Sequence, residues 1–456
     1  MQKIYRYFLS WLRTAVQSLA FLPLPMMIIG LLAGATLFFL EVNTDLGARV
    51  SEMLPAQILS SQETARSSLS LVIGGLITLT VFTFTQMMSL FSQVASSYSP
   101  RLLPYFTGAR SLQFVMGAYL AVIILSIIVL LSIRGNDEGY VPNFSVLFCL
   151  VLGVACLVVF LYFVTTISNK IQVTNIIETV YRKGVAAIDA EKDREGFEER
   201  DLPNDLSDWY AIPAPIGGYV GTVNHGRLSE LADEHDTRFY LGTARGMFIP
   251  RNFPLIQSER KLDEDTIKLV LEAVSPIHQK FSDWQLPPVR LLTEIAVKAM
   301  SPGINDPGTA IDVMDRQTGL LLRLMNLPEY NFYRSEDGGE VYFNTYKFTD
   351  ILATVMQQLR QYCKADITVV RRMTQMLFHL LGSAGGSLTY QRAVRKELSA
   401  LLEDARANLS NSADRSQLAA ELQLHRNNLN QLLNDTDFLL DAHLNEVGVQ
   451  ADANGK

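Results

Sequence analysis

The sequence contains few of the residues that most enzymes and metal proteins need for their chemistry. Its 456 residues include three cysteines and six histidines, which are too scattered for a disulfide framework or a zinc site. It has no Gly-x-Ser-x-Gly motif, no phosphate loop with lysine and no His-Glu-x-x-His motif. We therefore expect no metal ion, no cofactor and no catalytic residues of a familiar class. Each histidine is expected to be a surface residue or a hydrogen-bonded core residue rather than a metal ligand.

Charged residues are also scarce and are unevenly distributed along the chain. Asp, Glu, Lys and Arg make up 19% of the sequence against 48% hydrophobic residues, which is typical of a protein partly embedded in lipid. The first 170 residues carry nine basic and six acidic side chains, whereas the remainder carry 30 and 40. This acidic remainder repels nucleic acid backbones, so no nucleic acid partner is expected.

Four long apolar stretches contain no Asp, Glu, Lys, Arg or His. They are Phe21–Leu40, Leu69–Phe91, Leu112–Ile133 and Phe144–Ile167. Each is long enough to cross about 30 Å of hydrocarbon as a helix. We predict four transmembrane helices, with the lipid bilayer as partner. A proton-driven carrier is disfavoured, because such proteins usually place an ionisable relay at membrane depth.

Basic residues accumulate on one side of these predicted helices. If the N-terminus lies inside the cell, the inner flanks carry eight Lys and Arg residues and the outer flanks carry three. The inner ones are Lys3, Arg6, Arg13, Arg101, Arg110, Lys170, Arg182 and Lys183, and the outer ones are Arg49, Arg66 and Arg134. We predict a multi-pass membrane protein with both termini in the cytoplasm.

The predicted fold is an α-helical integral membrane protein in which a cytoplasmic α+β region follows the four transmembrane helices. Residues 1–20 form an amphipathic helix that lies in the headgroup plane or packs against the protein's own bundle. The further parts are a transmembrane domain with a helical extension (21–188), a charged linker (189–210), a small β-barrel (211–260), a mainly helical domain (261–446) and a disordered tail (447–456).

Short strands separated by turn residues predict the barrel. They are Gly217–Val223, Arg238–Leu241, Gly246–Pro250 and Pro254–Ile256. The glycines at 217, 218 and 221 indicate bulges rather than a dinucleotide site, since no helix is expected directly after them. The turn residues Asp337-Gly338-Gly339 then predict a hairpin. Apolar spacing and helix-start residues predict five helices. These are the hairpin Tyr330–Asn344 and the helices Asp263–Val274, Val289–Met300, Phe348–Leu381, Ala393–Leu409 and Leu418–Leu444.

The second apolar stretch carries a stripe of uncharged polar residues. At 100° per residue the hydroxyl side chains fall close to one line along the helix, with two glutamines beside them. The stripe consists of Thr78, Thr85, Ser89, Ser92, Ser96, Gln86 and Gln93. Such a face packs against another helix through hydrogen bonds, or it lines a water-filled pore. Both interpretations stay open, and packing between subunits would satisfy both.

A turn between two predicted helices is the second candidate site. It contains Ser301, Asn305 and Asp306, and Pro307 follows directly. Asp before Pro favours a helix start, because the Asp oxygen accepts free backbone amides and proline tolerates the first helical position. The alternative is that the three polar side chains converge on a ligand.

Three motifs resemble those of a known family. They are Ser99-Pro100-Arg101-Leu102-Leu103, Ile171-Gln172-Val173-Thr174-Asn175-Ile176-Ile177 and Ser301-Pro302-Gly303-Ile304-Asn305-Asp306-Pro307. Together they are similar to the bacterial predicted membrane proteins of the domain of unknown function 2254 family, over roughly residues 5–430. The resemblance implies a bacterial inner-membrane protein of four-helix type and brings no established reaction.

Two functions fit these predictions about equally well. The first is a homo-oligomeric, channel-like or pore-forming protein whose cytoplasmic domain forms a vestibule or sensor and concentrates cations by its acidic surface. The second is a non-transporting regulatory or scaffold protein whose cytoplasmic domain binds a partner or small ligand. A catalytic role is not expected; it would require Asp306→Ala to abolish turnover without unfolding the protein.

Overall fold

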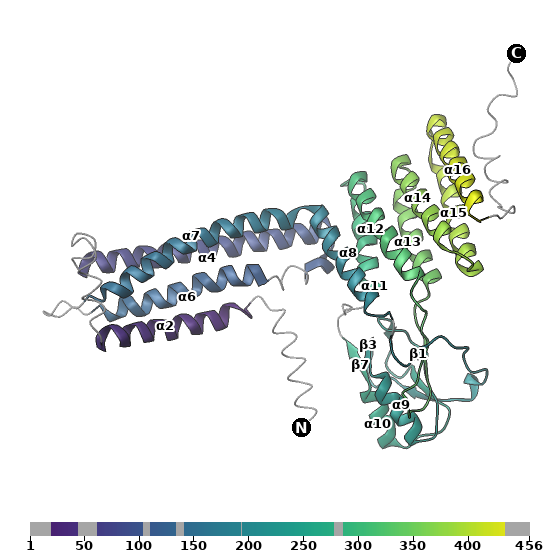
Figure 1. The fold of residues 1–456 in the computed structure, drawn as a ribbon, viewed down its shortest axis with the longest axis horizontal. Coiled ribbons are helices and arrows are strands. Elements are labelled where there is room, and N and C mark those ends of the chain that lie inside the picture. Colours follow the sequence, from purple (N-terminus) through teal and green to yellow (C-terminus); the bar gives the residue numbers. More distant parts are fainter. Residues whose placement is uncertain are drawn as a thin grey trace, which may run out of the picture. The chain divides into compact units, whose positions relative to one another are not determined.

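The computed structural model describes residues 20–43, 62–103, 110–133, 141–192, 194–277 and 286–433. Within them the chain divides into two compact units, Met1–Ile176 and Ile177–Lys456 (Figure 1). The predicted amphipathic helix lies outside the described residues except for its last residue, and the predicted tail lies wholly outside them.

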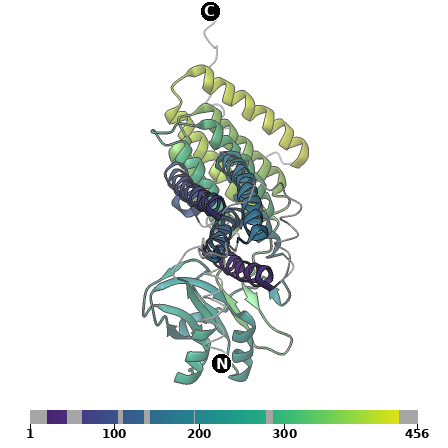
Figure 2. The same cartoon turned by 90° about the vertical axis from the view of Figure 1, so that its left-hand side faces the viewer.

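Four helices lie side by side in the described part of the first unit (Figure 2). They are α2 (Pro23–Asn43), α4 (Gln62–Ser97), α6 (Arg110–Ser132) and α7 (Asn143–Ile171). All four are long and apolar enough to cross a membrane, so the predicted set of four candidate membrane-spanning helices is confirmed. The predicted helical extension beyond the fourth span is interrupted at Gln172, where α7 ends and α8 (Val173–Asp189) begins.

Helices α2 and α6 approach each other closely at two glycines. A Cβ atom at Gly30 of α2 would lie 2.4 Å from the carbonyl oxygen of Ala121, and one at Gly117 of α6 would lie 2.5 Å from the sulfur of Met26. Small residues allow two helix backbones to come close together in a membrane. At Gly30 the opposing atom belongs to the backbone and cannot rotate away.

We expect Gly30→Ala to destabilise the first unit by about 1–3 kcal/mol, because α2 and α6 must separate to admit the new methyl group. Thermal melting of the full-length protein in detergent measures the effect. Gly75→Ala is the matched control, since a Cβ atom there meets nothing within 4 Å. Equal melting temperatures for the two variants would contradict the prediction.

Charged side chains connect helix ends within the first unit. The Glu41 carboxylate, at the end of α2, accepts hydrogen bonds from the backbone amides of Phe144 and Ser145 at 3.0 and 3.2 Å and from the Ser145 hydroxyl. Arg66, at the start of α4, donates to the carbonyl of Ile133 at 2.9 Å. The first turn of α7 and the C-terminal end of α6 are thus each capped by another helix.

Two β-sheets form part of the second unit. The larger has the order β1 (Phe197–Glu198), β8 (Phe332–Tyr333), β9 (Val341–Phe343), β4 (Phe239–Leu241), β6 (Pro254–Ser258) and β2 (Tyr210–Pro213). The smaller contains β5 (Phe248–Ile249), β3 (Gly218–Val223) and β7 (Val274–Ile277). Helices α9 (His225–Glu234) and α10 (Glu264–Glu272) contribute Leu228, Leu231 and Val270 to the core that they share with these strands.

The predicted small β-barrel at residues 211–260 is wrong, because neither sheet closes in the part of the chain that the structure describes. The expected strands are present, but they are divided between the two sheets. β4 pairs in parallel with β9, and β3 pairs with β7, so both take partners from outside the segment. Helix α9 also follows β3 directly, where no helix was expected. The hairpin within 330–344 is present as the antiparallel pair β8 and β9.

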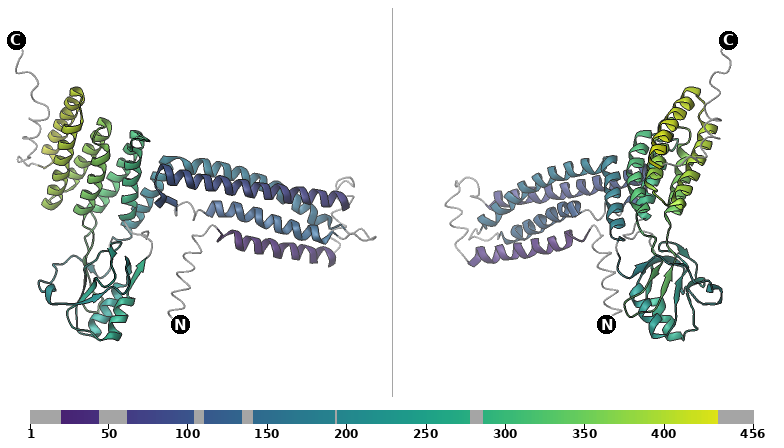
Figure 3. Two further views of the ribbon diagram at one scale, coloured as in Figure 1. Left: turned by 180° about the vertical axis from the view of Figure 1, so that it is seen from behind. Right: turned by 45° about the vertical axis from the view of Figure 1, so that its right-hand side comes forward.

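Six further helices pack against one another in the second unit (Figure 3). They are α11 (Leu286–Ala299), α12 (Pro307–Met325), α13 (Phe348–Cys363), α14 (Ile367–Ser383), α15 (Leu388–Asn408) and α16 (Ser412–Leu433). The predicted single helix over 348–381 is two helices, since Asp366 caps a new start by accepting the amides of Thr368 and Val369. The predicted linker segment contributes β1 to the larger sheet.

Candidate functional site

The polar stripe of α4 lies on the outside of the four-helix unit. Its seven residues are all exposed within this chain. The buried residues of α4 include Leu69, Leu76, Thr83 and Met87, and they lie on the opposite side of the helix at 100° per residue. Helix α4 therefore packs against α6 and α7 with one face and leaves its polar face uncovered by the rest of the unit.

The hydroxyl and amide groups of this stripe differ in whether their own helix satisfies their hydrogen bonds. Thr78 and Thr85 each donate to the carbonyl four residues earlier in their own helix, both at 2.9 Å. Their donors are therefore satisfied without a neighbouring helix. A glutamine amide has two donors and an acceptor, so Gln86 and Gln93 gain more than the hydroxyl groups from a polar partner or water.

The turn at Ser301–Asp306 shows the geometry of a helix cap. Asp306 is the N-cap of α12: one carboxylate oxygen accepts the Thr309 amide at 3.0 Å and the other accepts the Thr309 hydroxyl at 2.6 Å. These bonds lower the pKa of Asp306. The Ser301 hydroxyl donates to the Lys298 carbonyl, and Asn305 adopts a φ of 49°. Ser301 and Asp306 thus make hydrogen bonds within the turn, and Asn305 supplies its left-handed backbone conformation.

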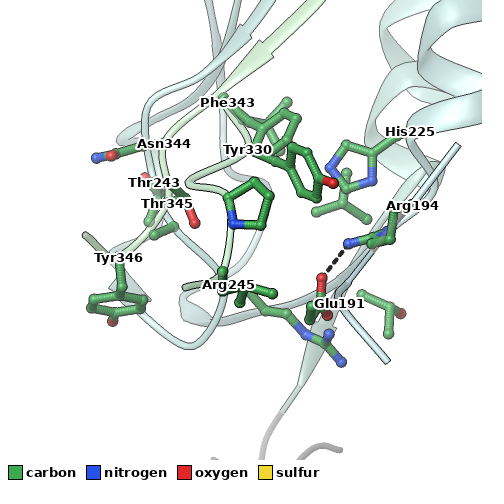
Figure 4. A pocket seen from close by; sticks show the side chains of 16 residues that line it. Glu191, Arg194, His225, Thr243, Arg245, Tyr330, Phe343, Asn344, Thr345 and Tyr346 are labelled. Atoms are coloured by element: carbon green, nitrogen blue, oxygen red, sulfur yellow. Dashed lines mark hydrogen bonds and ion pairs between the residues drawn. The ribbon is translucent and has the colours of Figure 1, made fainter. Parts of the chain in front are cut away.

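A cavity of about 260 Å³ lies in the second unit, beside the start of α9. Five segments line it: the turn after α8, the end of β3 with the first residue of α9, the turn after β4, the segment after α12 and the segment after β9. The side chains labelled in Figure 4 are Glu191, Arg194, His225, Thr243, Arg245, Tyr330, Phe343, Asn344, Thr345 and Tyr346. Sequence analysis did not predict this site.

Two arginines give the cavity its charge. Arg194 pairs with Glu191 at 2.6 Å, and its guanidinium lies 3.8 Å from the centre of the Phe197 ring. Arg245 comes from the turn after β4, and its side chain points toward this pair (Figure 4). The charged groups of the lining are thus two guanidinium groups and one carboxylate.

His225 is held as a neutral ring at the edge of the cavity. Burial, with the positive charges of Arg194 and Arg245 nearby, lowers the pKa of His225 to about 3, although a hydrogen bond to the Val223 backbone opposes the shift. The ring packs against Phe343 and Phe197 with centroid separations of 4.7 and 5.0 Å. At neutral pH the ring thus adds polarity without charge.

Metal chemistry has no obvious location in the described ranges, which contain no group of three or more His, Cys, Asp or Glu side chains placed to hold an ion. The charged groups of the cavity are a carboxylate paired with an arginine, a second arginine and a neutral histidine. This set suits an anion better than a cation, because guanidinium groups bind carboxylate and phosphate.

Comparisons with known proteins identify relatives but no established reaction. The family described as "Predicted membrane protein (DUF2254)" matches residues 16–379. Uncharacterised proteins of Mycobacterium bovis and of Mycobacterium tuberculosis strain H37Rv are each 22% identical over 403 residues, which cover 85% of this chain and 76% of theirs. No solved structure matches the chain.

Proposed function

The chain belongs to the family of predicted membrane proteins called DUF2254, and from this premise we propose that it forms a channel-like oligomer in the bacterial inner membrane. In this proposal the copies meet along the polar face of α4. Both termini and the acidic second unit lie in the cytoplasm, where that unit acts as a vestibule or sensor. The observation that carries the proposal is the exposed polar face on an otherwise lipid-compatible helix.

The length of α4 decides which polar residues would lie within the hydrocarbon. Its 36 residues extend about 54 Å, against about 30 Å of membrane core. Centring the apolar stretch 69–91 in the bilayer places Thr78, Thr85, Gln86 and Ser89 at membrane depth. Ser92, Gln93 and Ser96 then lie toward the interface. An exposed glutamine at membrane depth is costly against lipid, which favours a second copy or water over this face.

Proximity of the α4 faces can be tested by cross-linking. Ser89→Cys, in a background without the native buried cysteines, is expected to form a disulfide-linked dimer in native membranes on mild oxidation. Thr165→Cys is the matched control, because Thr165 is an exposed hydroxyl residue on α7. Equal cross-linking at the two positions, or none at position 89, would contradict the proposed contact.

Conductance separates a channel from an assembly that does not transport. In reconstituted planar bilayers we expect cation current from the wild type, a loss of at least tenfold in Ser89→Leu and little change in Thr165→Leu. Leucine replaces a hydroxyl group by a bulkier apolar group and so dewets a narrow pathway. Absence of current in the wild type, with oligomers intact, would leave the non-transporting interpretation.

A second candidate function is favoured by the cavity of the second unit. A membrane-anchored regulatory protein that binds a small ligand needs such a site and no pore. In that case Ser89→Leu changes oligomer stability at most, and the readout is ligand binding rather than current.

A further inference from the structure

We propose that the second unit binds the surface of an anionic lipid bilayer through two neighbouring segments, residues 213–217 and 248–254, which we call the loop pair. The exposed aromatic side chains of the loop pair insert at the boundary between headgroups and acyl chains. The inference depends on the surface of the second unit alone and does not need the α4 face to form a pore.

The two segments of the loop pair form one local structure. The backbone amide of Ala214 donates to the carbonyl of Phe253 at 2.8 Å, and the amide of Asn252 donates to the carbonyl of Ala214 at 2.9 Å. The same two segments continue into the pair β2 and β6 at one end and into the pair β3 and β5 at the other. The loop pair therefore joins the two sheets and presents its side chains from a hydrogen-bonded frame.

Large apolar side chains of the loop pair are exposed. Phe248 and Phe253 are each 59% exposed, and Ile216 is 46% exposed. A Cβ atom at Gly217 would lie 3.9 Å from the Cζ atom of Phe248, so this ring lies against the residue that follows Ile216. Clustered exposed apolar groups of this size mark a surface that binds a protein or a membrane.

A small apolar hollow adjoins this surface. Ile216 lines it together with Ile249, Leu255 and Leu271, and its volume is about 130 Å³. None of the residues that line it is charged, and the acidic helix α10 contributes only Leu271 to it. The hollow is too small for most soluble ligands, which occupy about 300 Å³ or more. It extends the apolar surface of the loop pair inward.

The charge distribution favours an anionic bilayer as the occupant. Residues 209–223 contain no charged side chain, and residues 239–258 contain two arginines and no Asp or Glu. The chain after residue 170 is otherwise acidic, with 40 acidic against 30 basic side chains. Arg251 is exposed and lies between Phe248 and Phe253 in the sequence. A basic side chain beside aromatic ones suits a leaflet with anionic lipids, whereas acidic side chains would be repelled by it.

The backbone of the loop pair and the family of the chain also suit a bilayer. Prolines at positions 213, 215, 250 and 254 are all exposed and carry no amide proton, so fewer donors lose water on insertion. The chain belongs to a family of predicted membrane proteins and has four candidate spans. Because such spans tether the second unit to a bilayer, even a weak insertion is populated through a high effective concentration of lipid.

Fluorescence quenching of the full-length protein in lipid nanodiscs tests the proposal. The discs contain phosphatidylcholine with phosphatidylglycerol, and a fluorophore is attached to Pro250→Cys in a background without the three native cysteines. We expect a lipid with a nitroxide near the headgroup to quench this label at least threefold more strongly than a label at Ser207→Cys. Ser207 is the matched control, because it is an exposed residue that precedes β2, whereas the loop pair follows β2. Iodide in solution is expected to show the opposite order.

Substitutions separate the apolar contribution from the charged one. Replacing Phe248 and Phe253 together by serine is expected to reduce nitroxide quenching at position 250 to the level at position 207. Tyr362→Ser is the matched control, since Tyr362 is a 51% exposed aromatic residue of α13 outside the loop pair, and it should leave quenching unchanged. Arg251→Gln is expected to weaken quenching in anionic discs and not in discs of phosphatidylcholine alone. Melting temperatures of all variants verify that they fold.

Several results would overturn the proposal. One is equal nitroxide quenching at positions 250 and 207, and another is undiminished quenching in the variant that lacks both phenylalanines. Equal quenching in neutral and anionic discs would exclude the attraction to anionic lipid. If the label at position 250 is shielded from iodide and the nitroxide lipid does not quench it, a protein surface covers the loop pair, from a second copy or from another partner, and the bilayer does not.

Discussion

Replacing Glu41 by alanine is expected to lower the free energy of unfolding of the first unit by about 3 kcal/mol, because the start of α7 loses a charged acceptor. The Glu41 side chain is only 6% exposed. Its two oxygens accept hydrogen bonds from the backbone amides of Phe144 and Ser145 and from the Ser145 hydroxyl group. In the Glu41→Ala variant these donors find no other acceptor within the helix, since the first amides of a helix lack internal partners.

The comparison of three variants distinguishes capping from a general effect of charge. Glu41→Gln keeps one acceptor oxygen and is expected to lose about half as much stability as Glu41→Ala. Glu63→Gln is the control, since Glu63 is an exposed acid in the first turn of α4. Unfolding by increasing amounts of sodium dodecyl sulfate in mixed micelles measures all three. The capping role would be refuted by equal midpoints for Glu41→Ala and Glu63→Gln.

The four spans were predictable because hydropathy is a local property of the sequence. The predicted first span ends at Leu40, however, and Glu41 is the next residue. The residues next to Glu41 in the sequence do not indicate that it caps α7, because its hydrogen-bond partners lie about a hundred residues later. Contacts of this kind follow from how helices pack, which composition does not specify.

In the sheets, too, nearby residues indicate where a strand lies, whereas its pairing depends on residues far away in the sequence. Apolar runs and turn residues predicted four strands within 211–258, which correspond to β3, β4, β5 and β6, whereas β2 was not predicted. The barrel was wrong because closure depends on partners: Leu241 of β4 pairs with Phe343, a hundred residues further along. The break in the predicted helix 348–381 has a local signal, since Asp366 directly precedes a helical run as N-cap residues do.

The cavity was beyond prediction from one sequence for a similar reason. Arg194 stood in the predicted charged linker, and His225 was one of six scattered histidines. Their meeting with Arg245 and Tyr330 requires five loop segments to converge. By contrast, the common side of the seven polar residues on α4 follows from helix periodicity, which is a local property of the sequence.

His225 should make the second unit sensitive to acid. Its pKa of about 3 in the folded protein lies below the ordinary value of 6.5. Between pH 3 and 6.5, therefore, His225 is mostly protonated in the unfolded chain and mostly neutral in the folded chain. The stability contributed by neutral His225 is therefore complete above pH 6.5. It is lost as the pH falls toward 3, at a rate approaching 1.4 kcal/mol per pH unit.

Urea unfolding of the wild type and His225→Asn between pH 4 and 7 isolates this effect. Carboxylates with lowered pKa values, such as Glu259 beside Arg238, also cost stability in acid, but they are common to both proteins and cancel in the difference. The wild type is expected to lose stability more steeply than His225→Asn below pH 6.5. His379→Asn is the matched control, because it replaces an exposed histidine of the same unit. Parallel curves for wild type and His225→Asn would exclude a strongly lowered pKa.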